Sequence, residues 1–173
     1  MKAVLISIQP KWCELIANRK KTVEVRRTRP TIETPFKCYI YCTKGSFDIT
    51  DCPDLQAESV QKVAKGRGKV IGEFVCDFFD EFSGGIGIGF KRFRAFAETC
   101  LTVQEMQEYL KGKDGYGWHI SELKIYDVPK ELGEFWAYRD IPQSLFEVWA
   151  YNEEPRRVTR PPQSWLYVEE IER

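Results

Sequence analysis

The chain has 173 residues, a formal net charge of zero, 43% hydrophobic residues and 30% charged residues. This size favours a single domain, residues 1–173, and the composition excludes a disordered or fibrous chain. No apolar run approaches the ~20 residues that a membrane helix requires, and residues 1–10 lack the features of a signal peptide, so we expect a cytoplasmic protein.

The N-terminal part of the chain predicts a strand, a short helix and a second strand. Residues 2–8 are rich in Val, Ile and Leu and predict a largely buried strand. Pro10 suits a first helical turn, and apolar residues at helical spacing continue the helix to about Ala17. Residues 22–27 alternate strictly, with two valines on one face and polar side chains on the other. This polar row consists of Thr22, Glu24 and Arg26.

The rest of the chain predicts further strands and one well-marked helix. Strands are expected over residues 37–43, 69–79, 117–126 and 164–170, with a bend or bulge at Gly72 and another bend near Ser121 and Glu122. Thr102 and Glu105 form a capping box that opens a helix, which Gly112 can end. Residues 51–68 predict a loop with a short helix over 55–64, and residues 129–135 a turn or short helix.

Five or six strands with two or more short helices are the elements of a small mixed α+β barrel. Residues 138–160 are expected to be an insertion or a long loop. The glycine-rich residues 84–89 match neither a P-loop nor a dinucleotide fingerprint, so they predict a flexible loop.

Charge is partitioned along the chain. Residues 1–37 contain nine Lys or Arg against three Glu, whereas the remaining residues contain 17 basic against 23 acidic side chains. Such an asymmetry suggests a basic surface for a phosphate-bearing partner, although a solvated face without a ligand has the same pattern.

Six cysteines are too few for a disulfide scaffold in a chain of this length, which favours reduced thiols. Cys38 and Cys42 share a predicted strand face, but the sequence contains no CxxC pair, so we predict no metal site. No motif indicates a cofactor, and no pattern defines the oligomeric state.

The sequence carries a family signature near its start. Residues 7–10 are Ser-Ile-Gln-Pro, a short predicted helix follows, and residues 18–26 are Asn-Arg-Lys-Lys-Thr-Val-Glu-Val-Arg. This run resembles the opening of ASCH domains, where a Ser-hydrophobic-x-Pro turn, a helix and a Gly-x-Lys-Thr-x-Glu-x-Arg strand form the ligand cleft. Residues 69–74 and 118–120 are similar to later parts of the same family.

The resemblance implies a PUA-like β-barrel related to domains that bind RNA or modified bases. Some ASCH proteins are amidohydrolases that remove the acetyl group of N4-acetylcytidine with a lysine, a threonine and a glutamate. Lys21 matches the catalytic lysine, but the catalytic threonine falls at Glu24, and Thr22 matches a different position. The family's glutamate has no motif that can be aligned here.

The candidate site residues each have a functional and a structural interpretation. Lys21 is a phosphate ligand or a general base with a lowered pKa, or else a solvated lysine. Glu24 and Arg26 either contact a base and a phosphate or form a structural ion pair. The aromatic candidates either stack on a base or belong to the core, and the single histidine, His119, is either a base or a structural residue.

The sequence therefore predicts a basic cleft, with Lys21 and Glu24 as candidate catalytic residues. The candidate ligand-binding residues are Ser7, Gln9, Pro10, Lys11, Trp12, Thr22, Arg26, Arg27, Trp118 and His119. Three functions stay open: a module that binds RNA or a modified nucleoside, an amidohydrolase acting on an acylated nucleoside, and a protein-interaction domain. Of these, the binding module is favoured, because the position of the catalytic threonine holds Glu24.

Overall fold

The computed structural model describes residues 1–46, 57–82, 96–138 and 155–171. Its strands are β1 (Lys2–Ile8), β2 (Val23–Arg26), β3 (Phe36–Cys42), β4 (Val70–Cys76), β5 (Phe79–Phe82), β6 (Gly115–His119), β7 (Ser121–Lys130), β8 (Trp136–Ala137), β9 (Arg156–Arg157) and β10 (Trp165–Glu169). The helices with described bounds are α1 (Pro10–Ala17), α2 (Ala57–Lys65), α4 (Val103–Leu110) and the 3-10 turn η2 (Leu132–Glu134).

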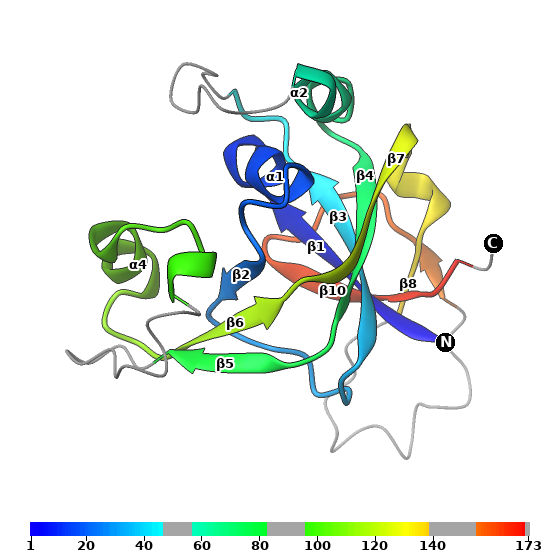
Figure 1. Cartoon of the computed structure of the whole chain (residues 1–173). Coiled ribbons are helices and arrows are strands. Elements are labelled where there is room, and N and C mark those ends of the chain that lie inside the picture. The colour runs from blue at the N-terminus through cyan, green and yellow to red at the C-terminus, as the bar shows by residue number, and fades with distance from the viewer. Residues whose placement is uncertain (47–56, 83–95, 139–154, 172–173) are drawn as a thin grey trace, which may run out of the picture.

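The strands form two sheets (Figure 1). The larger has the order β7-β4-β3-β1-β10-β8-β9 and the smaller the order β2-β6-β5. The predicted mixed α+β class is confirmed. The predicted number of five or six strands is wrong, since ten are described, and the strand pairing within the described residues does not close a barrel.

Two chain passages connect the sheets and account for part of the higher strand count. The predicted strand over residues 69–79 divides into β4 in the larger sheet and β5 in the smaller one. The predicted strand over residues 117–126 divides in the same way into β6 and β7, at the bend expected near Glu122, whose φ is 47°. The bend at Gly72 is also confirmed, because the β4–β7 register shifts between Val70 and Gly72.

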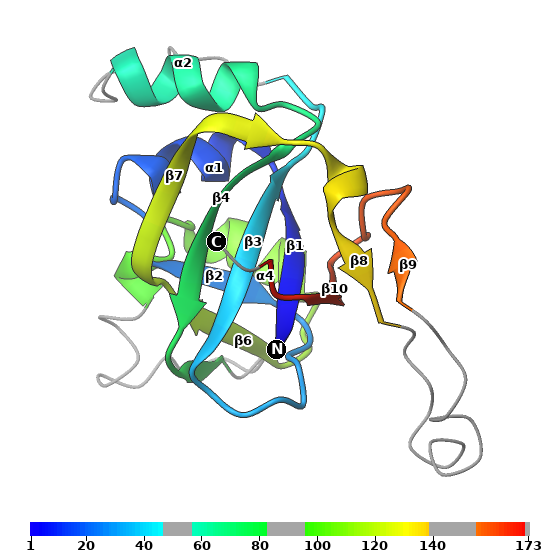
Figure 2. The ribbon, with the colours of Figure 1, turned by 90° about the vertical axis from the view of Figure 1, so that its right-hand side faces the viewer.

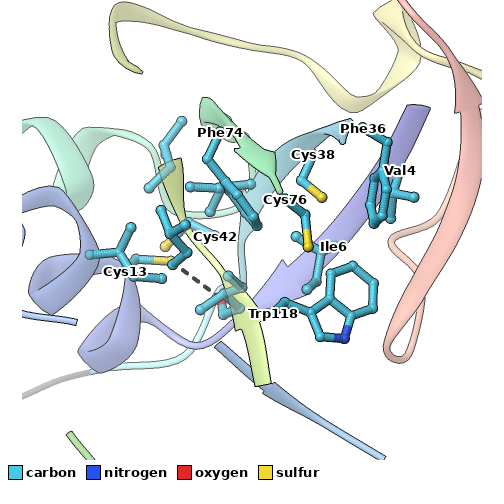
Figure 3. Packing of buried hydrophobic residues seen from close by; sticks show 14 of the residues in the cluster. Val4, Ile6, Cys13, Phe36, Cys38, Cys42, Phe74, Cys76 and Trp118 are labelled. Atoms are coloured by element: carbon cyan, nitrogen blue, oxygen red, sulfur yellow. Dashed lines mark hydrogen bonds between the residues drawn. The ribbon is translucent and has the colours of Figure 1, made fainter. Parts of the chain in front are cut away.

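Strand β1 is central to the larger sheet. It runs parallel to β3 and antiparallel to β10, and every residue after Lys2 is buried. Val4 and Ile6 (Figure 3) pack with Ile8 in one cluster, whereas Ala3 and Leu5 pack in a second cluster on the opposite face. A strand buried on both faces shows only weak alternation of polarity, as residues 2–8 do.

The two best-marked helices agree with their sequence signals. Pro10 is the first residue of α1, which ends at Ala17 as predicted. The capping box of Thr102 and Glu105 opens α4, and Gly112, with φ 72°, follows its left-handed C-cap. Both helices lie at the end of the molecule where β1 ends and β2 begins (Figure 1).

Some predictions fall wholly or partly outside the described residues: the glycine-rich loop over 84–89, Cys52, the beginning of the helix over 55–64, and most of the segment over 138–160. Of that last segment, residues 155–160 are described and contain β9. No helix within the described residues is long and apolar enough to cross a membrane.

Helix α1 carries a buried carboxyl group that should make stability depend on pH. Glu14 is 1% exposed, and burial raises the pKa of its carboxyl to about 7, against the opposing effect of Arg67. The folded state therefore binds more protons than the unfolded state between the ordinary pKa of 4.5 and about 7, so the free energy of unfolding falls as pH rises through this range.

We expect Glu14→Gln to weaken this pH dependence and to stabilise the protein by roughly 2 kcal/mol above neutral pH, since neutral Gln has no charge to bury. Urea denaturation at about pH 5 and about pH 8 measures both effects. The exposed Glu33 provides the matched control, Glu33→Gln. Equal changes with pH in the two variants would contradict the assignment to Glu14.

Candidate functional site

A cavity of about 1440 Å³ opens where β1 ends, α1 begins, and β2 and α4 approach the segment before β10. It is lined by Ser7, Gln9, Trp12, Lys21, Glu24, Val25, Arg26, Arg27, Thr28, Tyr41, Thr43, Lys44, Gly68, Leu101, Glu105, Glu108, Tyr109, Leu132, Thr159, Pro161, Pro162, Gln163 and Ser164. The cavity thus combines the N-terminal signature with segments that are distant in sequence.

A buried charge network of Lys21, Glu24 and Arg26 forms part of the lining. The Nζ of Lys21 lies 3.3 Å from Glu24 Oε2, and Arg26 Nη2 lies 2.9 Å from Glu24 Oε1. The three residues are only 2%, 5% and 8% exposed, respectively. One carboxylate therefore pairs with two cations away from bulk water, where the electrostatic interaction is stronger than at a surface.

Lys21 is held by three acceptors. Its Nζ donates to the backbone carbonyls of Val23 at 2.9 Å and Thr99 at 2.6 Å, in addition to contacting Glu24. Burial lowers the pKa of Lys21, while Glu24 acts in the opposite direction. Because an ammonium group has three N–H donors and each has an acceptor here, the contacts favour the charged form of Lys21.

Arg26 joins the network to β1. Its Nη2 donates to the backbone carbonyl of Ser7 at 2.6 Å. Its Nε is buried and makes no hydrogen bond within the described residues. A buried donor without a partner costs about 1–3 kcal/mol, so an acceptor that reached this atom would stabilise the site.

Aromatic side chains stand next to this network. Trp12 is half-buried, with Lys11 Nζ and Lys21 Nζ at 4.5 and 5.1 Å from its ring centroid. Tyr109 belongs to α4. Arg27 places its guanidinium 5.0 Å from the centroid of the Tyr109 ring and donates to the Tyr109 carbonyl. The cavity therefore offers ring faces as well as charged groups.

The charge of the lining is nearly balanced. Among the described lining residues, Lys21, Arg26, Arg27 and Lys44 oppose Glu24, Glu105 and Glu108. The prediction of a basic cleft counted charges along the first 37 residues, but α4 brings two of the three glutamates from elsewhere in the chain. The basic excess of the N-terminal segment is therefore not reproduced in the cavity.

The structure brings seven of the candidate residues to the cavity and places five elsewhere. The lining includes Ser7, Gln9, Trp12, Lys21, Glu24, Arg26 and Arg27, and it excludes Pro10, Lys11, Thr22, Trp118 and His119. Lys11 stays adjacent, because its Nζ pairs with Glu105 at 3.1 Å. Pro10 is buried at the start of α1, and Thr22 donates its backbone N–H to Glu98.

The structure places Trp118 and His119 outside the cavity. Trp118 is fully buried against Phe36 (Figure 3) and also packs on Phe79, so it belongs to the core and its ring is closed to a ligand. His119 stacks on Phe78 at 4.3 Å between ring centroids and places Nδ1 3.0 Å from Asp77 Oδ1. Both residues therefore have structural contacts outside the cavity.

Sequence reasoning missed the parts of the lining that come from β3, α4 and residues 159–164. Ser7 fixes the last of these, because its Oγ donates to Pro162 O at 2.7 Å and its N–H to Ser164 O at 2.9 Å. The capping box revealed α4, but no local pattern indicated that these segments meet the signature.

Comparison with known proteins yields structural matches only. No model of a protein family matches the sequence, and no curated protein does. The ASCH protein from Zymomonas mobilis aligns over 97% of this chain and 88% of its own, with a TM-score of 0.59 and 20% identity. Two single-substitution variants of that protein align over 98% and 97% of this chain and 92% and 89% of theirs, with TM-scores of 0.58 and 0.59 at 19% identity.

The chain therefore has the fold of ASCH domains, as the resemblance of its signature predicted. At this level of identity the likeness concerns the fold alone. One local departure fits the same fold: Arg19 stands where the signature has glycine, and it adopts the left-handed backbone conformation, φ 57°, that glycine adopts readily.

The buried charge network should dominate local stability. Glu24→Ala leaves two buried cations without their shared carboxylate, so we expect a loss of about 3–5 kcal/mol in the free energy of unfolding. Glu58→Ala, at an 82% exposed carboxylate paired with Lys62, is the control and should change the value by less than about 1 kcal/mol. Urea denaturation at neutral pH measures both; a loss for Glu24→Ala as small as that of the control would refute this role.

Proposed function

We propose that this protein is a binding module whose cavity holds an unpaired nucleobase, in RNA or in a modified nucleoside. The Lys21–Glu24–Arg26 network beside Trp12 carries this proposal. It supplies fixed hydrogen-bonding groups next to a ring face, which are the two kinds of contact by which proteins bind unstacked bases.

The hydrogen-bonding part rests on Arg26 and Glu24. Arg26 Nε is a buried donor with no acceptor in the described residues, so a carbonyl oxygen or ring nitrogen of a base would complete its hydrogen bonding. Glu24 Oε1 and Oε2 each contact one cation and keep a further lone pair to accept from an amino or imino group. Donor and acceptor together suit the edge of a base.

The charge balance of the lining narrows the class of ligand that the cavity suits. A polyphosphate would require an excess of basic side chains, whereas four basic and three acidic residues face this cavity. Arg27 and Lys44 are exposed, so a single phosphate of a nucleotide could contact them while the base stays inside. The ASCH fold gives additional support, because the signature resemblance associates this fold with RNA and modified bases.

Trp12 tests the stacking part of the proposal. We expect Trp12→Ala to weaken binding of a dinucleotide or nucleoside by about 5- to 150-fold, the effect of losing ~1–3 kcal/mol of stacking. Trp12→Phe should retain most of the affinity, because it keeps a ring face. Isothermal titration or fluorescence titration with a panel of ribonucleosides and dinucleotides measures the constants.

The matched control is Phe78→Ala, which removes a 45% exposed aromatic that does not line the cavity. This control should bind like the original protein. Equal affinity in Trp12→Ala and Phe78→Ala would remove the stacking role, and no binding of any nucleoside or dinucleotide would reject the proposed function.

A hydrolase acting on an acylated nucleoside is the second candidate. One observation favours it: Lys21, with a pKa lowered by burial, lies beside a carboxylate in the cavity, an arrangement that general bases use. The three acceptors around Lys21 Nζ oppose it, because they hold the protons that a base would have to release. Glu24 is likewise engaged, because its two carboxylate oxygens pair with Lys21 and Arg26.

We therefore expect N4-acetylcytidine to be recovered unchanged after incubation with the protein. Hydrolysis would break its amide C–N bond with one water and release cytidine and acetate, which chromatography separates. Release of cytidine by the protein but not by folded Lys21→Met would establish the hydrolase in place of the simple binding module. Circular dichroism verifies that the variant is folded.

A further inference from the structure

An exposed tryptophan stands on the short ribbon formed by β8 and β9. Trp136 is 39% exposed, and the strand register places it opposite Arg157, whose guanidinium lies 5.1 Å from the indole centroid. The ribbon is anchored, because Val158 donates its N–H to the carbonyl of the fully buried Phe135. The β8–β9 ribbon lies at the edge of the larger sheet (Figure 2). The partly exposed ring of Trp136 is therefore carried on anchored backbone at this edge.

Exposed arginines lie on β9 and in the residues that follow it. Arg156, Arg157 and Arg160 are all exposed, and none forms an ion pair within the described residues. The carboxylates of the neighbouring turn have other partners: Glu131 pairs with Lys69 at 2.5 Å and Glu134 with Lys130 at 3.7 Å. The described residues 156–160 therefore carry three exposed arginines, and one of them, Arg157, lies against the partly exposed indole of Trp136.

The same segment leads from the ribbon to the cavity. Arg160 lies between Thr159 and Pro161, and both of these residues line the cavity, as does the rest of the segment to Ser164. Ser7 holds this segment in place through Pro162 O and Ser164 O. From Arg157 to Pro162 the chain is five residues long and spans at most about 17 Å, so the ribbon and the cavity mouth are close neighbours.

We propose that Trp136, Arg157 and Arg160 form an outer subsite for single-stranded RNA, continuous with the cavity. The inference rests on the proposed function and deepens it by naming the ligand as a polymer: one base enters the cavity, and flanking nucleotides cross the ribbon. Arginines contact the phosphates, and Trp136 stacks on a base. Sequence-tolerant binding of single strands commonly combines these two elements, whereas acidic protein partners do not require an open ring face.

The experiment compares a dinucleotide with a single-stranded RNA of roughly 12 nucleotides, a length within the range that single-strand binding domains cover. The variants are Trp136→Ala and the double change Arg157→Gln with Arg160→Gln. Lys124→Gln, which removes an exposed charge from β7 at the opposite edge of the larger sheet, is the matched control. Fluorescence anisotropy at several salt concentrations gives the affinities, and thermal melting verifies the folded state.

We expect the 12-nucleotide RNA to bind more tightly than the dinucleotide. The double arginine change should weaken the long RNA about tenfold or more and reduce the slope of log K against log salt by about 1.4, since each phosphate contact of a single strand contributes about 0.7. Trp136→Ala should weaken the long RNA at least about fivefold. The dinucleotide affinity should stay unchanged in all three variants.

Three outcomes overturn the inference: equal affinity for the long and short ligands, an effect of the ribbon variants no larger than that of Lys124→Gln, or binding of a poly-glutamate peptide in preference to the RNA. Either of the first two outcomes removes only the outer subsite if the protein still binds the dinucleotide and Trp12→Ala still weakens that binding. The proposed function then stands. Loss of dinucleotide binding itself is the separate failure of the proposed function.

Discussion

The pairing of Glu24 with both Lys21 and Arg26 in a buried position is the constraint on which the site depends. Removing three charges from water is costly, and the structure offsets this cost with ion pairs and with backbone carbonyls from Val23, Thr99 and Ser7. These acceptors belong to β2, to the segment before α4 and to the end of β1. The network therefore fixes the relative positions of the three elements around the cavity.

This arrangement has a chemical consequence. Lys21 and most of Arg26 are committed to contacts within the protein, so they are poor candidates for capturing phosphate, and Lys21 is also a poor candidate for accepting a proton. The groups not used by these contacts are the Arg26 Nε donor and the second lone pairs of Glu24, and the ring of Trp12 lies beside them. Such a set suits the base of the proposed function, whereas the exposed arginines of residues 156–160 are free of ion pairs within the described chain and are better suited to phosphates.

Local signals in the sequence predicted the elements well. Pro10, the strict alternation over residues 22–27 and the capping box of Thr102 and Glu105 correspond to α1, β2 and α4 in the structure. They act within a few residues of the chain, which is why a pattern can reveal them. Two members of the predicted polar row, Glu24 and Arg26, belong to the buried network together with Lys21, although alternation alone could not tell a solvent face from a cavity lining.

Such local signals do not predict contacts between segments that are distant in the sequence. Trp118 was considered for base stacking, but its burial depends on Phe36 and Phe79, which lie in other strands. The charge of the cavity was overestimated because Glu105 and Glu108 approach from α4, about 80 residues after the signature. The β8–β9 ribbon, with two residues in each strand, is too short to give a periodic pattern.

The role of the network is tested most directly by observing Arg26 itself during binding. In the nitrogen-15 labelled protein, the Nε–H resonance of Arg26, assigned with an Arg26→Lys variant, would be followed while a ribonucleoside or dinucleotide is added. Base recognition by this network predicts a saturable shift of that resonance and slower exchange of its proton with water, with the same affinity as the bulk titration. An Arg26 resonance that stays unchanged while the ligand saturates the protein would contradict it.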